Sequence, residues 1–243
     1  MAKAFRNSWW AVLLLMLCAA PNALAQSMSL QLNDPPSNNI LDNIYVGPYG
    51  ATNTQTGGSM QVICDDFRDE SNTNNWTYTV NTFSNLGNTL WGSMLLKAGD
   101  TMTQVTSLYQ EAGWLALGMF NQSGTTQGYY SYALWAVFQP GQVLNWLKTN
   151  LDFAACQAIF GNNCTSTSAA AGSLLAKAQQ YGSSGNYSNL VILTPQGCGV
   201  GSCPEQEFFA LVPEGSSRFL YLLLASLACF GMMLHSRRNL VVH

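Results

Sequence analysis

Charged residues are scarce in this sequence, at 9% of 243 residues, and histidine is scarcer still. Only nine residues are basic, too few for the clustered Lys and Arg contacts that hold nucleic-acid phosphates. The two histidines, His235 and His243, both lie at the C-terminal end. The preceding chain therefore has no imidazole for a serine–histidine triad, a cysteine–histidine dyad or a histidine-ligated zinc ion. These absences exclude a nucleic-acid partner and those kinds of site within the chain, and we predict no metal and no cofactor.

The N-terminal segment has the parts of a secretory signal peptide. Two basic residues precede an apolar run over residues 9–20, and Ala23 and Ala25 form a small-residue cleavage site. We therefore predict a signal peptide over residues 1–25 and an exported chain that starts at Gln26. An uncleaved anchor is the alternative, although the apolar run is shorter than the roughly 20 residues that cross a bilayer.

The C-terminal segment combines a short motif, an apolar run and a basic pair. An apolar stretch over residues 219–235 predicts a single transmembrane helix, and the basic pair after it would stay cytoplasmic. The motif and the basic pair consist of Val212, Pro213, Glu214, Arg237 and Arg238. This arrangement resembles the PEP-CTERM sorting signal, which an exosortase-type enzyme recognises and processes on exported bacterial proteins.

The resemblance assigns residues 213–238 to the sorting signal and leaves residues 239–243 as a short tail. It departs from the family pattern at Gly215, where a second proline is expected. The resemblance implies a protein at the cell surface or in the extracellular matrix that is anchored in the membrane at least transiently. A plain single-pass tail anchor is the alternative.

Between the two ends, residues 26–212 form one predicted extracellular domain with an acidic balance. All twelve acidic residues and only four of the nine basic residues lie between positions 26 and 217, so that segment has a formal charge of −8. Such a balance suits an extracellular surface better than contact with an anionic membrane.

Five of the seven cysteines lie in this domain, in a compartment where disulfides form and persist. Cys156 and Cys164 flank one short loop, and Cys198 and Cys203 flank another, so two local disulfides are the economical pairing. Cys64 then stays unpaired. Zinc binding by Cys198 and Cys203 is the alternative, but no neighbouring ligands complete a tetrahedral site.

Hydrophobic periodicity indicates strands at both ends of the domain and helices between them. Strands are predicted over residues 29–32, 43–49, 60–65, 75–80, 190–193 and 207–212. Helices are predicted over residues 105–119, 129–138, 141–148 and 169–181. Because the order is strands, helices, strands, with no alternating β-α-β unit, the pattern indicates an α+β fold.

Two segments stand out within this pattern: Cys64 on a predicted strand, and Ala133-Leu134-Trp135 on a predicted buried helix. Their order and surroundings resemble the thioester domains of bacterial surface adhesins. In that family a strand-borne cysteine forms an internal thioester with the glutamine of a Thr-Gln-x-Ala-Ile-Trp helix, on a β-sandwich or barrel with an inserted helical subdomain. The resemblance spans residues 40–212, and it implies that fold and a reactive role for Cys64.

The match fails at the glutamine position, where Ser131 stands, and at the threonine position, where Tyr130 stands. A serine hydroxyl has no acyl carbon from which a thioester could form. Gln127, one helical turn earlier, and Gln139, eight residues later, are the alternative acyl donors. We therefore predict a non-catalytic surface or matrix protein, with a role in biofilm, that binds exopolysaccharide or another surface protein. A covalent adhesin acting through Cys64 is the alternative.

A cluster of acidic residues follows the candidate cysteine. Its members are Asp65, Asp66, Asp69 and Glu70. They lack the Asp-x-Asp-x-Asp-Gly spacing of a calcium loop, and no second acidic cluster lies elsewhere in the domain, so we predict a solvated acidic turn. The alternative is an enzyme that acts on extracellular polysaccharide through a carboxylate pair.

Overall fold

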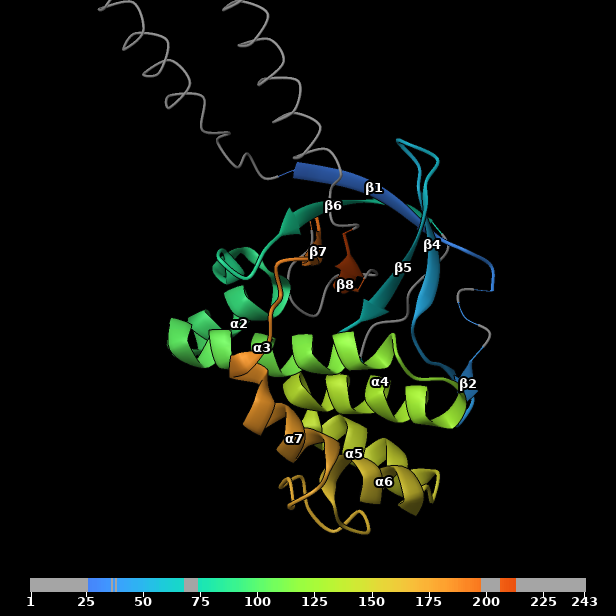
Figure 1. Cartoon of the computed structure of the whole chain (residues 1–243), viewed down its shortest axis with the longest axis vertical. Coiled ribbons are helices and arrows are strands. Elements are labelled where there is room, and N and C mark those ends of the chain that lie inside the picture. Colours follow the sequence, from blue (N-terminus) through green and yellow to red (C-terminus); the bar gives the residue numbers. More distant parts are fainter. Residues whose placement is uncertain (1–25, 36, 38, 68–73, 198–205, 213–243) are drawn as a thin grey trace, which may run out of the picture.

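The computed structural model describes residues 26–35, 37, 39–67, 74–197 and 206–212 (Figure 1). The strands are β1 (Gln26–Leu32), β2 (Ile40–Leu41), β3 (Ile44–Tyr45), β4 (Tyr49–Asn53), β5 (Ser59–Cys64), β6 (Asn75–Asn81), β7 (Leu190–Pro195) and β8 (Phe208–Leu211). The α-helices are α2 (Leu90–Ala98), α3 (Met102–Met119), α4 (Gly124–Phe138), α5 (Pro140–Thr149), α6 (Phe153–Phe160) and α7 (Leu174–Tyr181). Two short 3-10 helices, η1 (Leu86–Asn88) and η2 (Gly182–Ser184), flank the helical region.

Six of these strands close into an antiparallel barrel in the order β1-β4-β5-β8-β7-β6, and β2 and β3 form a separate hairpin. The six α-helices all lie between β6 and β7 in the chain, and Figure 1 shows them packed as a layer beneath the barrel, with α3 and α4 nearest to it. The predicted α+β fold is confirmed, with a barrel and an inserted helical part.

Strand alternation divides the apolar side chains between two cores, because successive side chains of a strand point to opposite faces. On β5, Val62 and Cys64 point into the barrel, where Tyr78 and Phe208 also lie fully buried. Between them, Ile63 points to the helices and joins the larger core that α3 and α4 share with the barrel wall. The end of β5 therefore presents one side chain to each core in turn.

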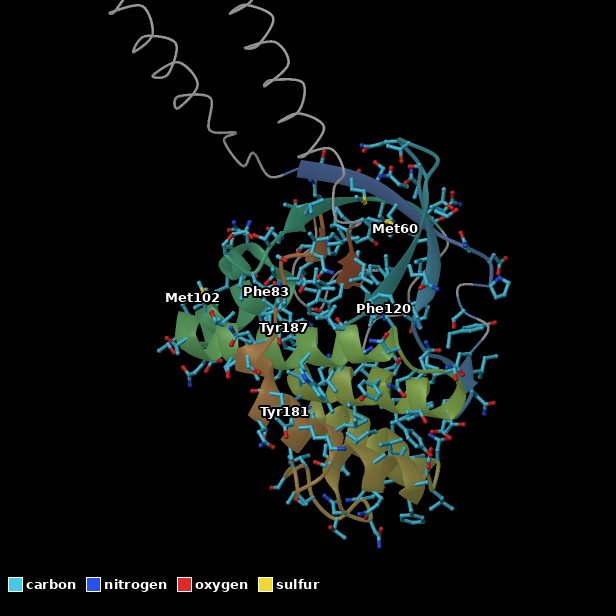
Figure 2. All side chains as sticks on the ribbon, in the orientation of Figure 1. Met60, Phe83, Met102, Phe120, Tyr181 and Tyr187 are labelled. Carbon is cyan, nitrogen blue, oxygen red and sulfur yellow. A yellow bond between two sulfur atoms is a disulfide. The ribbon has the colours of Figure 1, made fainter. Side chains whose placement is uncertain are left out.

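One aromatic stack marks the contact between the barrel end and the helical layer. Phe83, just after β6, and Tyr187, just before β7, lie together in Figure 2, with their ring centroids 4.5 Å apart and their planes 13° from parallel. On α3, a Cβ at Gly113 would lie 2.8 Å from the Phe83 ring and 3.0 Å from the Tyr187 ring. The missing side chain at Gly113 is thus what lets the stack lie against α3.

The helix boundaries follow local capping. Helix α3 starts after Thr101, which forms a reciprocal capping box with the third helical residue, and α5 starts at Pro140, whose ring suits a first helical position. The predicted helix over residues 169–181 begins only at Leu174, because Ser173 caps it with its hydroxyl.

Two further differences from the predicted elements have local causes. The predicted strand 43–49 is interrupted into β3 and β4, with Pro48, which has no backbone N–H to donate, between them. Helix α6 was not predicted from periodicity; Asp152 caps it by accepting from the Ala155 backbone N–H at 2.9 Å.

Several predicted features lie outside the described residues. They are the signal peptide 1–25, the sorting signal 213–238 with its predicted helix 219–235 and its residues Pro213, Glu214, Arg237 and Arg238, the tail 239–243, and the pair Cys198 and Cys203. Of the sorting motif, Val212 is described; it is exposed, and its backbone N–H donates to Asn189. Across the described ranges, no helix combines the length and the apolar character that crossing a membrane requires.

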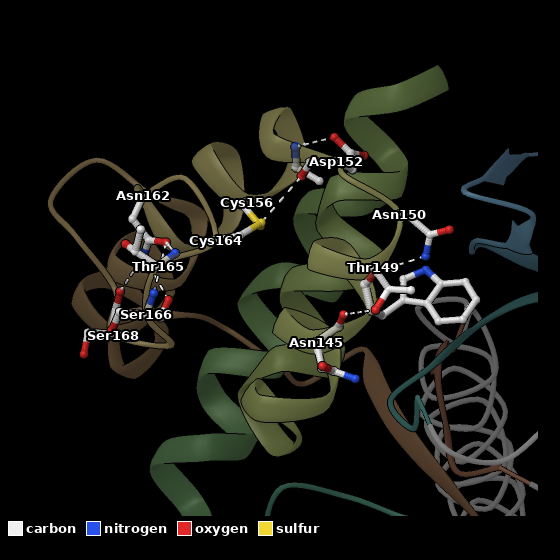
Figure 3. Close-up of a disulfide and its surroundings, with 12 residues drawn as sticks. Asn145, Thr149, Asn150, Asp152, Cys156, Asn162, Cys164, Thr165, Ser166 and Ser168 are labelled. Atoms are coloured by element: carbon white, nitrogen blue, oxygen red, sulfur yellow. Dashed lines mark hydrogen bonds between the residues drawn. A yellow bond between two sulfur atoms is a disulfide. The ribbon is translucent and has the colours of Figure 1, made fainter.

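The predicted disulfide between Cys156 and Cys164 is present (Figure 3). It ties α6 to the loop that follows, and both cysteines are buried. The same loop is held by Asn162, whose side chain accepts from the Thr165 backbone N–H and donates to the Ser166 carbonyl. The far end of the helical layer is therefore fastened covalently and by local hydrogen bonds.

Replacing both Cys156 and Cys164 with alanine is expected to lower the free energy of unfolding by about 2.5 kcal/mol, the chain-entropy value for so short a loop. The sequence separation of the two cysteines is 8, which sets this modest size. Urea unfolding of the double variant beside the wild type, with and without reductant, measures the effect. Reduction should cost the wild type about 2.5 kcal/mol more than the variant, in which only the predicted pair Cys198 and Cys203 can lose a disulfide. Equal sensitivity of both proteins to reductant would contradict the prediction.

Candidate functional site

The candidate site is built around Cys64, the last residue of β5. Cys64 is the free cysteine of the described residues, and its side chain is 1% exposed. Its thiol donates to the Asp66 carbonyl, with Sγ 2.9 Å from that oxygen, and Sγ accepts from the Asp66 backbone N–H at 3.2 Å. Burial, followed by the nearby Asp65 and Asp66 carboxyls, raises the pKa of the thiol well above its usual range. Cys64 is therefore a protonated thiol engaged by the next turn of its own chain.

Helix α4 brings its tryptophan to the same place. The Trp135 indole Nε1–H donates to the Cys64 carbonyl oxygen at 3.0 Å. The Trp135 ring also contacts Phe67 and Tyr132, with centroid distances of 5.3 Å to each. The structure thus brings together the strand residue and the helix residue that sequence reasoning singled out.

The side chain at the glutamine position is occupied elsewhere. The Ser131 hydroxyl oxygen accepts from the Gly47 backbone N–H at 3.0 Å and is 3.5 Å from the Met119 sulfur. Ser131 is 1% exposed, so this serine belongs to the packing between α3, α4 and the chain before β4.

The two alternative glutamines also have other partners. The Gln127 amide donates to the Met119 and Gln122 carbonyls, at the beginning of α4. Gln139 accepts from the Phe67 backbone N–H at 2.8 Å and donates to the Asp66 carboxylate at 3.0 Å. Gln139 is the nearer of the two to the cysteine segment, but its hydrogen bonds hold the turn after Cys64 rather than the thiol.

The acidic residues after Cys64 differ from the prediction. Asp65 and Asp66 are 0% and 4% exposed, so the expectation of a solvated turn is wrong for these two residues. Gln139, at the end of α4, binds the Asp66 side chain, and Gln206, before β8, donates to the Asp66 carbonyl at 3.1 Å. These two contacts hold the turn in a buried position. Asp69 and Glu70 lie outside the described residues.

Asp65 faces a residue that sequence reasoning missed, Glu207. The β5–β8 register pairs Cys64 with Phe208, and the Asp65 N–H donates to the Glu207 carbonyl, so the two acids stand directly opposite on neighbouring strands. Glu207 is also 0% exposed. The only signal in the sequence was an acid at the first position of the predicted strand 207–212, which does not reveal its cross-strand partner.

The Glu207 carboxylate collects hydrogen-bond donors from the helices and from β7. It accepts from the Leu90 backbone N–H at 2.6 Å, from the Tyr109 hydroxyl at 2.5 Å and from the Thr194 hydroxyl at 2.5 Å. Leu90 is the first residue of α2, so the carboxylate also sits at the positive end of a helix dipole. Burial, followed by the charges of Glu207 and Asp65, raises the pKa of Tyr109 well above 10, which keeps its hydroxyl a donor.

No protein-family model, curated protein or solved structure matches this chain. Among the described residues, no group of three or more histidine, cysteine or acidic side chains is arranged to hold a metal ion.

Proposed function

We propose that the chain is an exported surface or matrix protein of a bacterium, and that its domain acts by non-covalent binding, to an exopolysaccharide or to another surface protein. The observation that supports non-covalent binding is the state of Cys64. Its thiol is buried and hydrogen-bonded to Asp66, Ser131 stands at the acyl-donor position, and Gln139 is engaged by Asp66 and Phe67.

Three features support export. The Cys156–Cys164 disulfide is of the kind that persists in oxidising compartments. The N-terminal segment has the pattern of a signal peptide, and the C-terminal segment resembles a PEP-CTERM signal that an exosortase-type enzyme would process.

The carboxylate-enzyme alternative has less support. A glycosidase needs two acids that face a substrate across an open cleft. The acids that do face each other, Asp65 and Glu207, are both 0% exposed and lie between the barrel and the helical layer. They have no route by which a sugar chain reaches them in this conformation, so they support a binding protein better than a hydrolase.

Intact mass spectrometry of the protein purified from producing cells tests the proposal, before and after methylamine and, separately, a thiol alkylator without reductant. We expect a mass that starts at Gln26, includes the predicted disulfides Cys156–Cys164 and Cys198–Cys203, shows no loss of ammonia beyond cyclisation of the N-terminal glutamine and gains nothing from methylamine. Cys64 should be alkylated only after unfolding, and a Cys64→Ser variant serves as the matched control. Loss of one ammonia with methylamine addition, both absent from Cys64→Ser, would instead establish a covalent adhesin with Gln127 or Gln139 as acyl donor.

A further inference from the structure

The helix-facing side of the barrel carries a row of neighbouring polar side chains, which we name the polar seam. It consists of Asp65 on the β5 end, Glu207 before β8, Thr194 on β7 and Asn81 on β6. Asn81 donates to the Thr194 hydroxyl at 2.9 Å, and Thr194 donates onward to Glu207. The Asn81 and Thr194 side chains thus both donate in the direction of the Glu207 carboxylate, which identifies Glu207 as the anion that the others stabilise.

The two acids of the polar seam differ in the hydrogen-bond donors that surround them. Glu207 accepts from Leu90, Tyr109 and Thr194, whereas neither carboxyl oxygen of Asp65 receives a donor from the described residues. The group that faces the Asp65 side chain across the β5–β8 pairing is the Glu207 carboxylate. Two carboxyl groups can share a hydrogen bond only when one of them is protonated, because ionised carboxylates are acceptors alone.

The donors decide which acid holds the proton. Placing it on Glu207 would remove the charge that a helix N-terminus and two hydroxyls stabilise, and would leave a bare buried anion at Asp65. Placing it on Asp65 gives the orphaned acid a hydrogen bond to donate and leaves the anion where the donors are. Among the described residues, the other titratable groups near the pair are Asp66 and Cys64 from its own strand segment and Tyr109 from α3, and none of these three brings a positive charge.

We propose that Asp65 and Glu207 hold a single proton between them, carried by Asp65, and that this proton fastens the barrel to the helical layer. Glu207 is the link, since it binds the first backbone N–H of α2 and the Tyr109 hydroxyl of α3 from the barrel side. Removal of the proton leaves two negative charges facing each other in a buried site, and their repulsion weakens this contact. The folded domain is accordingly most stable at mildly acidic pH and becomes less stable as the pH rises. This inference does not rest on the proposed function.

The direction of the pH dependence follows from linkage. Burial, followed by the charges of Glu207 and Asp66, raises the folded-state pKa of Asp65 well above its usual 3.8, so the folded chain binds a proton that the unfolded chain has lost at neutral pH. Its stabilising contribution is complete below pH 3.8 and is lost as the pH rises through the raised folded value. The pKa of Glu207 is also raised, chiefly by burial, and acts in the same direction. The unfolding constant therefore rises up to about tenfold per pH unit for each proton concerned.

A matched pair of variants, Asp65→Asn and Glu207→Gln, tests the proton's place. Both replace a carboxyl by an isosteric amide, but only Asp65→Asn reproduces a donor toward a retained Glu207 anion. Urea unfolding of the full chain in a mild detergent, from roughly pH 5 to pH 9, should show that the stability of the wild type falls as the pH rises. In Asp65→Asn the increase of the unfolding constant should be smaller by a factor of about ten per pH unit. At neutral pH, Asp65→Asn should be no less stable than the wild type, while Glu207→Gln should unfold with a constant about 100-fold higher, because its amide cannot satisfy three donors.

The opposite ranking, with Glu207→Gln tolerated and Asp65→Asn destabilised, would place the proton on Glu207 and overturn the proposal. A second measurement on the wild type avoids dependence on variant folding. Infrared spectroscopy at neutral pH should show the C=O stretching band of one buried protonated carboxylic acid, absent in Asp65→Asn. A wild-type spectrum without such a band would mean that both acids are ionised, and would equally overturn it.

Discussion

Replacing Trp135 with alanine should lower the free energy of unfolding by about 3–5 kcal/mol, the range for truncating a buried large aromatic side chain. The ring is 3% exposed and packs against Phe67 and Tyr132, so its removal leaves a cavity between α4 and the end of β5. The indole also satisfies the buried Cys64 carbonyl, which alanine would leave without this donor. Urea unfolding followed by circular dichroism measures the loss.

Trp135→Phe is the control that separates packing from the hydrogen bond. Phenylalanine keeps much of the ring but cannot donate, so the loss should shrink to about 1–3 kcal/mol. Because Trp135 holds the carbonyl of Cys64, we also expect native alkylation of that thiol to become faster in Trp135→Ala. If Trp135→Ala lost less than about 1 kcal/mol, the contact between α4 and β5 would not be a principal support of the fold.

Replacing Gly92 with alanine is expected to be comparably damaging, although the change adds only one methyl group. Gly92 lies in the first turn of α2, where a Cβ would come within 1.9 Å of the Leu86 carbonyl oxygen and 2.6 Å of the Thr89 hydroxyl. The Leu86 carbonyl is backbone held by its own hydrogen bond from Thr89, so it cannot move aside cheaply. We expect a loss of about 3 kcal/mol or more, at the upper end of overpacking effects.

Gly141→Ala is the matched control, because it makes the same chemical change in another helix with open space around the site. No atom lies within 4 Å of a Cβ at Gly141, in the first turn of α5. Helix propensity there favours alanine by up to about 1 kcal/mol. Thermal or urea unfolding should therefore move in opposite directions for the two variants. A Gly92→Ala protein as stable as Gly141→Ala would show that η1 and α2 can separate without loss.

Local sequence patterns predicted those features of the fold that depend on residues close together in the chain. The strand–helix–strand order, the helix over most of residues 105–119 and the Cys156–Cys164 disulfide depend on residues close together in the chain. Periodicity and loop length are properties of such neighbours, so a single sequence suffices to read them. The same holds for the start of α5 at Pro140, where capping is local.

Tertiary structure alone decided the features that join distant segments. The apparent acidic turn after Cys64 is buried because β8 brings Glu207 opposite Asp65, and no periodicity in either segment encodes that pairing. The packing of α4 against the end of β5 decides likewise which glutamine lies near the cysteine segment. The place of the proton depends in addition on α2 and α3, since their donors select Glu207 as the anion. Sequence by itself determined the fold class and the order of the strand and helix regions. Only the packing of barrel against helices determined the environment, and hence the charge, of the side chains between them, because burial and hydrogen bonding of an acid are set by neighbours far away in the chain.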